Sequence, residues 1–460
     1  MESFQRRGGF GTGGGRRMME QRKKLDNYLD RVCAEVRAKG MHREIREELS
    51  GHFQDLMLER QQLGATEEEA QQYAIAQMGD PQVIGRDLHR IHKPRIPWGL
   101  LTAVMMLSAV SLLGMGAIEA GTSFNPALSD LTMRQTVYII LGIAVMTGMY
   151  FVNFKLLQRA SGFIYAAALM AIVASLLLGQ LINGNRHYVG FLGLYFDLVG
   201  YSPYIFVVAL TGIWTSHSFM LKWRRRTREL AEVALLLLPA VIYAAIRSLP
   251  ELVVYLAVSL TLYVWITRRW ITAGLMVITF VSGGAIYVWN NLNLRDRVIG
   301  AINHNYMLNG PGYLNRRIHE TITSAGWRGY GFGGAEEGLP YAYSDLFPVF
   351  LVQCFGWAGG MLFIAAVGWF VLKMISYTRA VRDTYGRMLI LALALMLAIR
   401  LAYGLSILSG RMPITAIPFP FLSYGQHVFI EFAAVGLLMG VYRRKDMLPA
   451  DTSLDLTMDA

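Results

Sequence analysis

Two ionisable residues, Arg400 and Glu431, lie within long apolar stretches of the chain. A charge in the hydrocarbon core of a membrane is costly unless it is paired or hydrated, so such residues pair with each other or serve a substrate, ion or proton path. We favour a mutual Arg400–Glu431 ion pair over direct substrate contact, because buried charges are generally paired. A third carboxylate, Glu251, falls at the start of an apolar stretch and is predicted to lie at the membrane interface.

A proline-rich segment, GRMPITAIPFPFLSYG, runs from Gly410 to Gly425. Its prolines forbid a continuous helix and predict a rigid, partly extended hairpin. These prolines are Pro413, Pro418 and Pro420. Ser423 and Tyr424 then lead into the last apolar stretch.

One carboxylate stands just before another apolar stretch. Ser344 and Asp345 precede it, and Pro348 falls in its first turn. Taken alone, this arrangement is typical of a helix N-cap, at which a short polar side chain accepts a backbone N–H.

The proline-rich segment resembles the signature Gly-x-x-Pro-x-Thr-Gly-Ile-Pro-x-Pro-Phe-x-Ser-Tyr-Gly-Gly of the FtsW/RodA/SpoVE family. Three further stretches resemble family motifs in the same order. They are Pro250-Glu251-Leu252, Gly312-Tyr313 followed by Ser324–Gly331 (SAGWRGYG), and Tyr343-Ser344-Asp345-Leu346-Phe347. The resemblance covers most of residues 97–442.

The resemblance implies a peptidoglycan glycosyltransferase that acts on a lipid-linked disaccharide-peptide at the outer face of the plasma membrane. The family's essential acid corresponds to Asp345, which would act as general base on the acceptor hydroxyl. The lipid diphosphate leaving group requires cations. We expect them, and the rest of the substrate site, from Arg186, Arg316, Arg317, Arg328, Ser423 and Tyr424. A divalent cation, Mg²⁺ or Mn²⁺, can share that work, although no cofactor is certain and no ligand cluster is visible. The implied partner is a class B penicillin-binding protein.

The chain departs from the family pattern at three places. Tyr201-Ser202-Pro203-Tyr204 replaces the usual Gln-Pro-Ser-Glu, and no lysine follows until Lys222. Gln353-Cys354 replaces a Glu-Glu pair, and Gly425-Gln426-His427-Val428 replaces Gly-Gly-Ser-Ser. These departures keep open a catalytically silent regulator of envelope assembly. A transporter (flippase) of the lipid-linked precursor is a second alternative, which many spans with polar interior groups would permit.

The elements that position these residues follow from hydropathy. The chain has 460 residues, of which 54% are hydrophobic and 16% charged, with a net charge of +11. A membrane span requires about 20 mostly apolar residues. Runs of about that length predict an all-α, polytopic fold of about ten transmembrane helices. They lie at 97–118, 135–154, 160–182, 202–220, 230–247, 250–267, 271–291, 346–372, 388–408 and 425–442.

Lysine and arginine indicate the orientation, because cytoplasmic loops are enriched in them. If the front end is cytoplasmic, the inside loops hold 16 such residues and the much longer outside loops hold 9. Both termini are thus predicted to lie in the cytoplasm. The cations sit in short clusters between apolar runs, which argues against a nucleic-acid-binding protein. The long outside segment 292–344 is rich in glycine and is predicted to be ordered, without obvious secondary structure, over a lipid-borne sugar.

Four parts are predicted along the chain. Residues 1–21 form a disordered Gly/Arg-rich tail, 22–92 a soluble helical domain, 96–445 the membrane domain and 446–460 a cytoplasmic tail. The soluble part resembles the permease prefix domain of Gram-positive membrane proteins, clearest at Arg46–Leu49 and Met78–Pro81. Thr66 with Glu69 predicts a capping box, and Asp80-Pro81 predicts a further helix start.

Overall fold

The computed structural model describes two compact units, one formed by the described residues before Ile96 and one spanning Ile96–Tyr442. The described residues are 12–91, 93, 96–121, 129–182, 185–191, 194–216, 225–303, 310, 312–334, 339–415 and 417–445. The side chains at 12–22, 39, 181–187, 191–194 and 225 lie outside the description.

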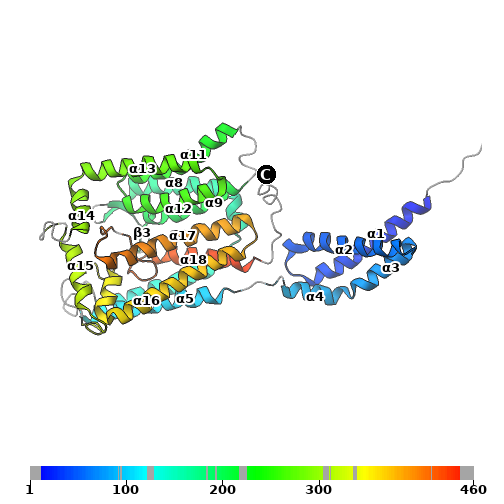
Figure 1. Cartoon of the computed structure of the whole chain (residues 1–460), viewed down its shortest axis with the longest axis horizontal. Helices are drawn as coiled ribbons and strands as arrows, with labels where there is room; N and C mark the ends of the chain where they lie inside the picture. The colour runs from blue at the N-terminus through cyan, green and yellow to red at the C-terminus, as the bar shows by residue number, and fades with distance from the viewer. Residues whose placement is uncertain are drawn as a thin grey trace, which may run out of the picture. The chain divides into compact units, whose positions relative to one another are not determined.

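The first unit is a small helical domain with its own apolar core (Figure 1). Its helices are α1 (Thr12–Glu35), η1 (Lys39–Met41), α2 (His42–Gln62), α3 (Glu67–Met78) and α4 (Pro81–Ile91). Two apolar stripes at helical spacing, one on α1 and one on α2, meet in this core, represented by Val32 and Phe53. The charged side chains that the structure describes in these helices are exposed or half-buried, outside this core.

The helix boundaries in this unit follow local sequence signals. Glu69 N–H donates to Thr66 Oγ1 and Thr66 N–H donates to Glu69 Oε2, so the predicted capping box is confirmed. Asp80 Oδ1 accepts from the Gln82 N–H at 2.9 Å, and α4 begins at Pro81 as predicted. The disordered tail was predicted to cover residues 1–21, but α1 already begins at Thr12. Residues 1–11 lie outside the described residues.

The second unit is a bundle of long apolar helices (Figure 1). Eight helices among the described residues are long and apolar enough to cross a membrane. They are α5 (Trp98–Gly121), α6 (Leu131–Phe151), α8 (Ser161–Leu178), α9 (Leu198–Thr215), α12 (Leu249–Thr267), α13 (Trp270–Asn290), α16 (Phe347–Ala380) and α17 (Thr384–Ser406), the last extended by η3 (Ile407–Ser409). The predicted all-α polytopic membrane fold is confirmed.

The other two predicted spans are helices as well, α11 (Arg225–Ala245) and α18 (Val428–Arg443). α18 has only 16 residues because the irregular segment before it runs on to His427. α11 carries Glu232, whose side chain is 2% exposed. Arg228 Nε lies 2.9 Å and Arg269 Nη1 2.8 Å from its carboxylate oxygens, so the charge is neutralised within the protein.

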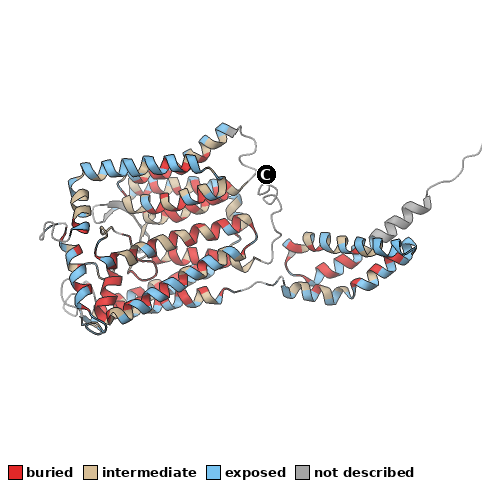
Figure 2. Ribbon diagram, viewed as in Figure 1, coloured by how far each residue is buried: buried red, intermediate tan, exposed pale blue. Residues whose placement is uncertain are grey.

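Two helices form the centre of the bundle. Most residues of α9 and α17 are buried, whereas those of α13 are largely exposed (Figure 2). α17 packs against α9, α12 and α16. Polar side chains on α9 and α17 are therefore enclosed by protein.

One end of the bundle carries more secondary structure than predicted (Figure 1). A three-stranded antiparallel sheet precedes α9: β1 (Gln180–Ile182), β2 (Asn185–Phe191) and β3 (Leu194–Asp197), with Tyr188 opposite Asp197. The segment expected to lack regular structure contains α14 (Leu292–Ile302) and α15 (Tyr313–Ser324). A short α7 (Phe154–Arg159) links α6 to α8.

α16 is interrupted at Gly356, whose φ of 66° and ψ of −173° are not helical. The glycine-rich segment after α15 fills the interruption. Tyr330 N–H donates to Gln353 O at 2.9 Å, and Trp357 N–H donates to Gly326 O at 2.9 Å. This part of the segment is therefore bound to α16 through backbone hydrogen bonds and has a structural role.

Candidate functional site

A cavity of about 1120 Å³ opens at the end of the bundle that carries the sheet, α14 and α15. The sheet, α9, α12, α14, α15, α17, the turn before α16 and the segment before α18 all contribute to it. Its ionisable lining residues are Asp197, Glu251, Asp345, Arg297, Arg400 and His427. Tyrosines are abundant in the lining: Tyr138, Tyr188, Tyr195, Tyr201, Tyr313, Tyr341, Tyr343 and Tyr424. Such a mixture of aromatic rings and convergent polar groups is typical of a ligand site.

Asp345 lies in the turn before α16 and faces this cavity. Its carboxylate accepts a hydrogen bond from Ser344 Oγ at 2.9 Å. Burial raises the pKa of Asp345 to about 6, against the smaller lowering effects of the Ser344 hydroxyl and His427. The N-cap of α16 is Leu346, and no side chain caps that helix, so the N-cap interpretation of Asp345 is wrong.

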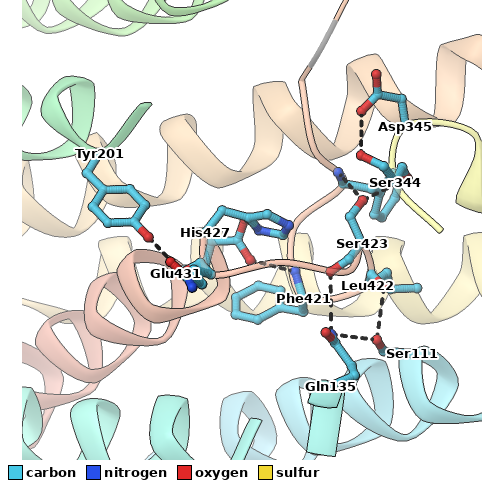
Figure 3. A network of polar contacts seen from close by, with 12 residues as sticks. Ser111, Gln135, Tyr201, Ser344, Asp345, Phe421, Leu422, Ser423, His427 and Glu431 are labelled. Carbon is cyan, nitrogen blue, oxygen red and sulfur yellow. Dashed lines mark hydrogen bonds and ion pairs between the residues drawn. The ribbon is translucent and has the colours of Figure 1, made fainter. Parts of the chain in front are cut away.

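The proline-rich segment holds this turn in place (Figure 3). Ser423 Oγ donates to Ser344 O at 2.9 Å and accepts from the Phe419 N–H at 2.7 Å. Tyr424 N–H donates to Tyr343 O at 2.7 Å. The segment is irregular and deeply packed, with Phe421 fully buried at a φ of 65°. Ser423 thus positions Asp345, and Tyr424 lines the cavity beside it.

Two polar residues of the first spans anchor the segment from below, and the sequence analysis missed both. Ser111 Oγ donates to Leu422 O at 2.9 Å (Figure 3). Gln135 Nε2 donates to Ser111 Oγ at 3.1 Å and to Ser423 O at 3.4 Å. Both side chains are fully buried. The signal was available, because each is a polar residue within an apolar run.

The prolines have different places. Pro418 lines the cavity together with Gly425. Pro413 O accepts from Tyr403 Oη at 2.6 Å, which ties the segment to α17. Pro420 follows Phe419 in the buried part and does not line the cavity.

The predicted Arg400–Glu431 pair is wrong. Glu431 is fully buried and accepts from the Phe421 N–H at 2.7 Å, and His427 Nδ1 lies 3.0 Å from its other oxygen (Figure 3). The irregular segment leaves backbone N–H groups that need an acceptor, and Glu431 is the acceptor at hand. Among the described residues, no carboxylate makes an ion pair with Arg400, whose guanidinium carbon lies 5.1 Å from the Tyr204 ring centre.

Glu251 also lines the cavity, near the start of α12. Ser248 Oγ donates to its Oε2 at 2.5 Å. The family-like Pro-Glu-Leu motif therefore supplies a cavity carboxylate, consistent with its predicted place at one end of a span.

The predicted substrate cations do not form the cavity. Arg316 on α15 pairs with Glu320 at 2.7 Å, and Arg317 and Arg328 are not among the lining residues. The side chain of Arg186, on β2, lies outside the described residues. The cavity's arginines are instead Arg297 on α14 and Arg400 on α17. The predicted position on the outer side did not distinguish cavity-facing arginines from surface ones.

The described residues contain no group of three His, Cys, Asp or Glu side chains that could hold a metal ion. The three cavity carboxylates come from separate elements and offer no shared donor set. Mg²⁺ or Mn²⁺ at this site would draw its ligands mainly from a bound diphosphate, and its participation stays a prediction.

Known proteins with related sequences include members of the family that the motifs resemble. The chain is 23% identical over 363 residues to a probable peptidoglycan glycosyltransferase FtsW of Thioalkalivibrio sulfidiphilus, covering 74% of this chain and 88% of the relative. It is 25% identical over 380 residues to the protein of that name from Synechocystis, covering 80% and 92%.

Solved structures share the fold. A chain of a peptidoglycan synthase complex that coordinates polymerization and crosslinking superposes with a TM-score of 0.63 at 20% identity, covering 76% of this chain and 98% of that one. The rod shape determining protein RodA of Thermus thermophilus gives 0.54 at 18% identity, covering 76% and 97%. Residues 94–447 match the family of cell cycle proteins named for FtsW, RodA and SpoVE. The chain therefore belongs to the FtsW/RodA/SpoVE family of cell cycle proteins.

Proposed function

We propose that this protein is a peptidoglycan glycosyltransferase that polymerises a lipid-linked disaccharide-peptide in cell division or cell-shape control. The observation that carries the proposal is Asp345, a carboxyl group with a pKa raised to about 6 in a large polar and aromatic cavity. A pKa near the working pH is what a general base requires. The names of the curated relatives support the same activity.

In the proposed reaction, Asp345 takes the proton from an acceptor sugar hydroxyl as its oxygen attacks the anomeric carbon of the donor. The bond from that carbon to the lipid diphosphate breaks, and the diphosphate leaves with the bonding electrons. Ser423, Tyr424 and the turn at Ser344 keep the carboxylate in place through the hydrogen bonds described above. Tyr138, Tyr343 and Tyr424 pack ring against ring and offer amphipathic surfaces for sugars.

We further propose that the cavity opens to the outer face and that both termini are cytoplasmic. The bias of lysine and arginine supports this orientation. The proposed partner is a class B penicillin-binding protein, that is, a transpeptidase. The similarity to a chain from a synthase complex supports an assembly of this kind.

The test is polymerisation of labelled lipid-linked precursor by the purified, reconstituted protein, with and without its transpeptidase partner. The wild type should make polymer and Asp345→Ala should not. If the wild type makes no polymer in either state, the catalytically silent regulator becomes the better assignment. That reading has one structural observation in its favour: Gln353 and Cys354, where the family has two glutamates, are buried outside the cavity.

A further inference from the structure

Arg400 is a buried cation that makes no ion pair with any carboxylate among the described residues. It lies on the central helix α17 and is 4% exposed. Its Nε is enclosed and has no hydrogen-bond partner among the described residues. A guanidinium left in this condition inside a membrane protein is costly, so it faces water or an anionic ligand.

Two carboxylates of this region accept hydrogen bonds from other groups. Glu431 binds the Phe421 N–H and His427. Glu251 is near enough to interact with the charge of Arg400, but it accepts from Ser248 Oγ and makes no ion pair with Arg400 in the part of the chain that the structure describes. What holds Arg400 instead is the face of the Tyr204 ring on α9, at 5.1 Å. Stacking on an aromatic ring fixes a guanidinium plane while leaving its N–H edge free.

Arg400 is one of the residues lining the cavity, so an anion bound there can reach its guanidinium. Among the spanning helices that line the cavity, α9 supplies neither lysine nor arginine. Arg297, the other lining arginine, is exposed and comes from α14. Arg400 is therefore the desolvated cation of this site, and Arg297 is a cation at its surface.

We propose that Arg400 is an anion-binding residue of the cavity and that its ligand is a phosphate-type group, the diphosphate of the lipid-linked donor. The planar fork of a guanidinium matches two phosphate oxygens, which a point charge does not. This assignment rests on the proposed function for the identity of the diphosphate. In the reaction, Arg400 would bind the diphosphate oxygens and stabilise their charge as the bond to the sugar breaks.

A structural role and an anion-binding role for Arg400 predict different unfolding temperatures of the ligand-free protein. An uncompensated buried charge destabilises the fold, so Arg400→Met and Arg400→Gln should unfold at temperatures no lower than the wild type. A lipid diphosphate should raise the unfolding temperature of the wild type but not of either variant. If both variants instead unfold earlier than the wild type without ligand, and gain the same shift with it, Arg400 is a structural residue.

The binding experiment uses the full chain in lipid nanodiscs, without acceptor, so that no turnover is needed. The probes are polyprenyl diphosphate, the uncharged polyprenol and free inorganic pyrophosphate. Loss of one charge-assisted contact should weaken polyprenyl diphosphate binding by about 10- to 100-fold in Arg400→Gln, and leave polyprenol binding unchanged. Arg316→Gln is the matched control, because that arginine lies outside the cavity and pairs with Glu320.

The probes separate the source of the anion. A loss for both polyprenyl diphosphate and pyrophosphate supports a site that reads the phosphates themselves, whether lipid-borne or free. A loss for polyprenyl diphosphate alone supports a site that requires the lipid. Equal affinity of the wild type and Arg400→Gln for polyprenyl diphosphate overturns the inference. If the protein never polymerises but binding depends on Arg400, only the proposed reaction fails.

Discussion

Ser423 Oγ donates a hydrogen bond to the carbonyl oxygen of Ser344 at 2.9 Å, across 79 residues of sequence. The contact joins the proline-rich segment to the turn that carries Asp345. The same hydroxyl accepts the Phe419 N–H, so one buried side chain satisfies the segment and fixes the turn. The most family-like motif of the chain thus acts on the candidate general base through a backbone carbonyl.

Ser423→Ala should therefore affect both stability and activity. It leaves the buried Phe419 N–H without an acceptor, which should lower the free energy of unfolding by about 1–3 kcal/mol. Polymerisation should also fall, because the Asp345 turn loses a support. The control is Ser376→Ala, an exposed hydroxyl on α16 that bonds its own helix, with an expected change within about 0.5 kcal/mol. Equal behaviour of the two variants in detergent unfolding would contradict this account.

A second test asks whether the interruption of α16 requires glycine at position 356. Its φ and ψ lie in a region that is essentially restricted to glycine, and an added Cβ would come within 2.4 Å of the Trp327 carbonyl carbon. Gly356→Ala should cost at least about 1–3 kcal/mol from backbone strain alone.

Gly368 is the matched control on the same helix. An added Cβ there meets nothing within 4 Å, so Gly368→Ala should stabilise α16 by up to about 1 kcal/mol. The measurement is thermal or denaturant unfolding of both variants. A tolerated Gly356→Ala would mean that the interruption of α16 is not needed to seat the glycine-rich segment.

Local signals made much of the fold predictable. Thr66 and Asp80 mark helix starts through atoms within three residues of themselves, and apolar runs mark the spans through composition. Asp345 and the proline-rich segment were found through a motif whose residues are contiguous in sequence. In each case, the signal that identifies the residue lies in its neighbours along the chain.

The errors concern long-range partners. Arg400 and Glu431 both lie in apolar runs, and only the packed fold decides that Glu431 takes the Phe421 N–H while Arg400 stacks on Tyr204. Likewise, charge and side of the membrane could not tell Arg316, paired on a surface helix, from Arg297, which reaches the cavity. Competition between backbone N–H groups and arginine for a carboxylate is not visible in a hydropathy profile.

The orientation of the membrane domain is directly testable. A reporter fused after Ala460 should report the cytoplasm, and a cysteine in place of Thr323, which is exposed on α15, should react with an impermeant reagent added outside. The native Cys33 and Cys354 are buried and should give a low background. Ten spans, the predicted number, would place both ends on one side, because that number is even. A C-terminus reachable from outside would rule out this topology.

Asp345→Asn separates chemistry from folding. Because Leu346 rather than Asp345 is the N-cap of α16, neither Asp345→Asn nor Asp345→Ala should impair folding or insertion. Polymerisation should fall by about 10²- to 10⁴-fold in both, since each removes the basic oxygen. Full activity in Asp345→Asn would end the assignment of this residue as general base.

The raised pKa of Asp345 also predicts a stability difference with a definite sign. The folded-state pKa of about 6 exceeds the ordinary value of 3.8, so the folded protein holds this proton more tightly than the unfolded chain. Stability should therefore decline as the pH rises from about 4 to 6, because ionising the buried carboxyl is costly. Asp345→Asn lacks that decline and should be more stable than the wild type at pH 8, by about 1–3 kcal/mol. Equal pH dependence of unfolding in the two proteins would contradict the raised pKa.

The same pKa sets the pH profile of the proposed reaction. A general base works when deprotonated, so polymerisation should rise with pH, with a midpoint near 6, and level off above about 7. An aspartate with the ordinary pKa of 3.8 would give a flat profile over that range.

His427 lines the same cavity and lowers the pKa of Asp345, so His427→Gln should move the midpoint of the pH profile to higher pH. Rates should be measured at saturating precursor, with Arg316→Gln as the control whose midpoint stays at the wild-type value. A midpoint that stays at the wild-type value or moves to lower pH in His427→Gln would contradict the effect of this histidine on the pKa of Asp345.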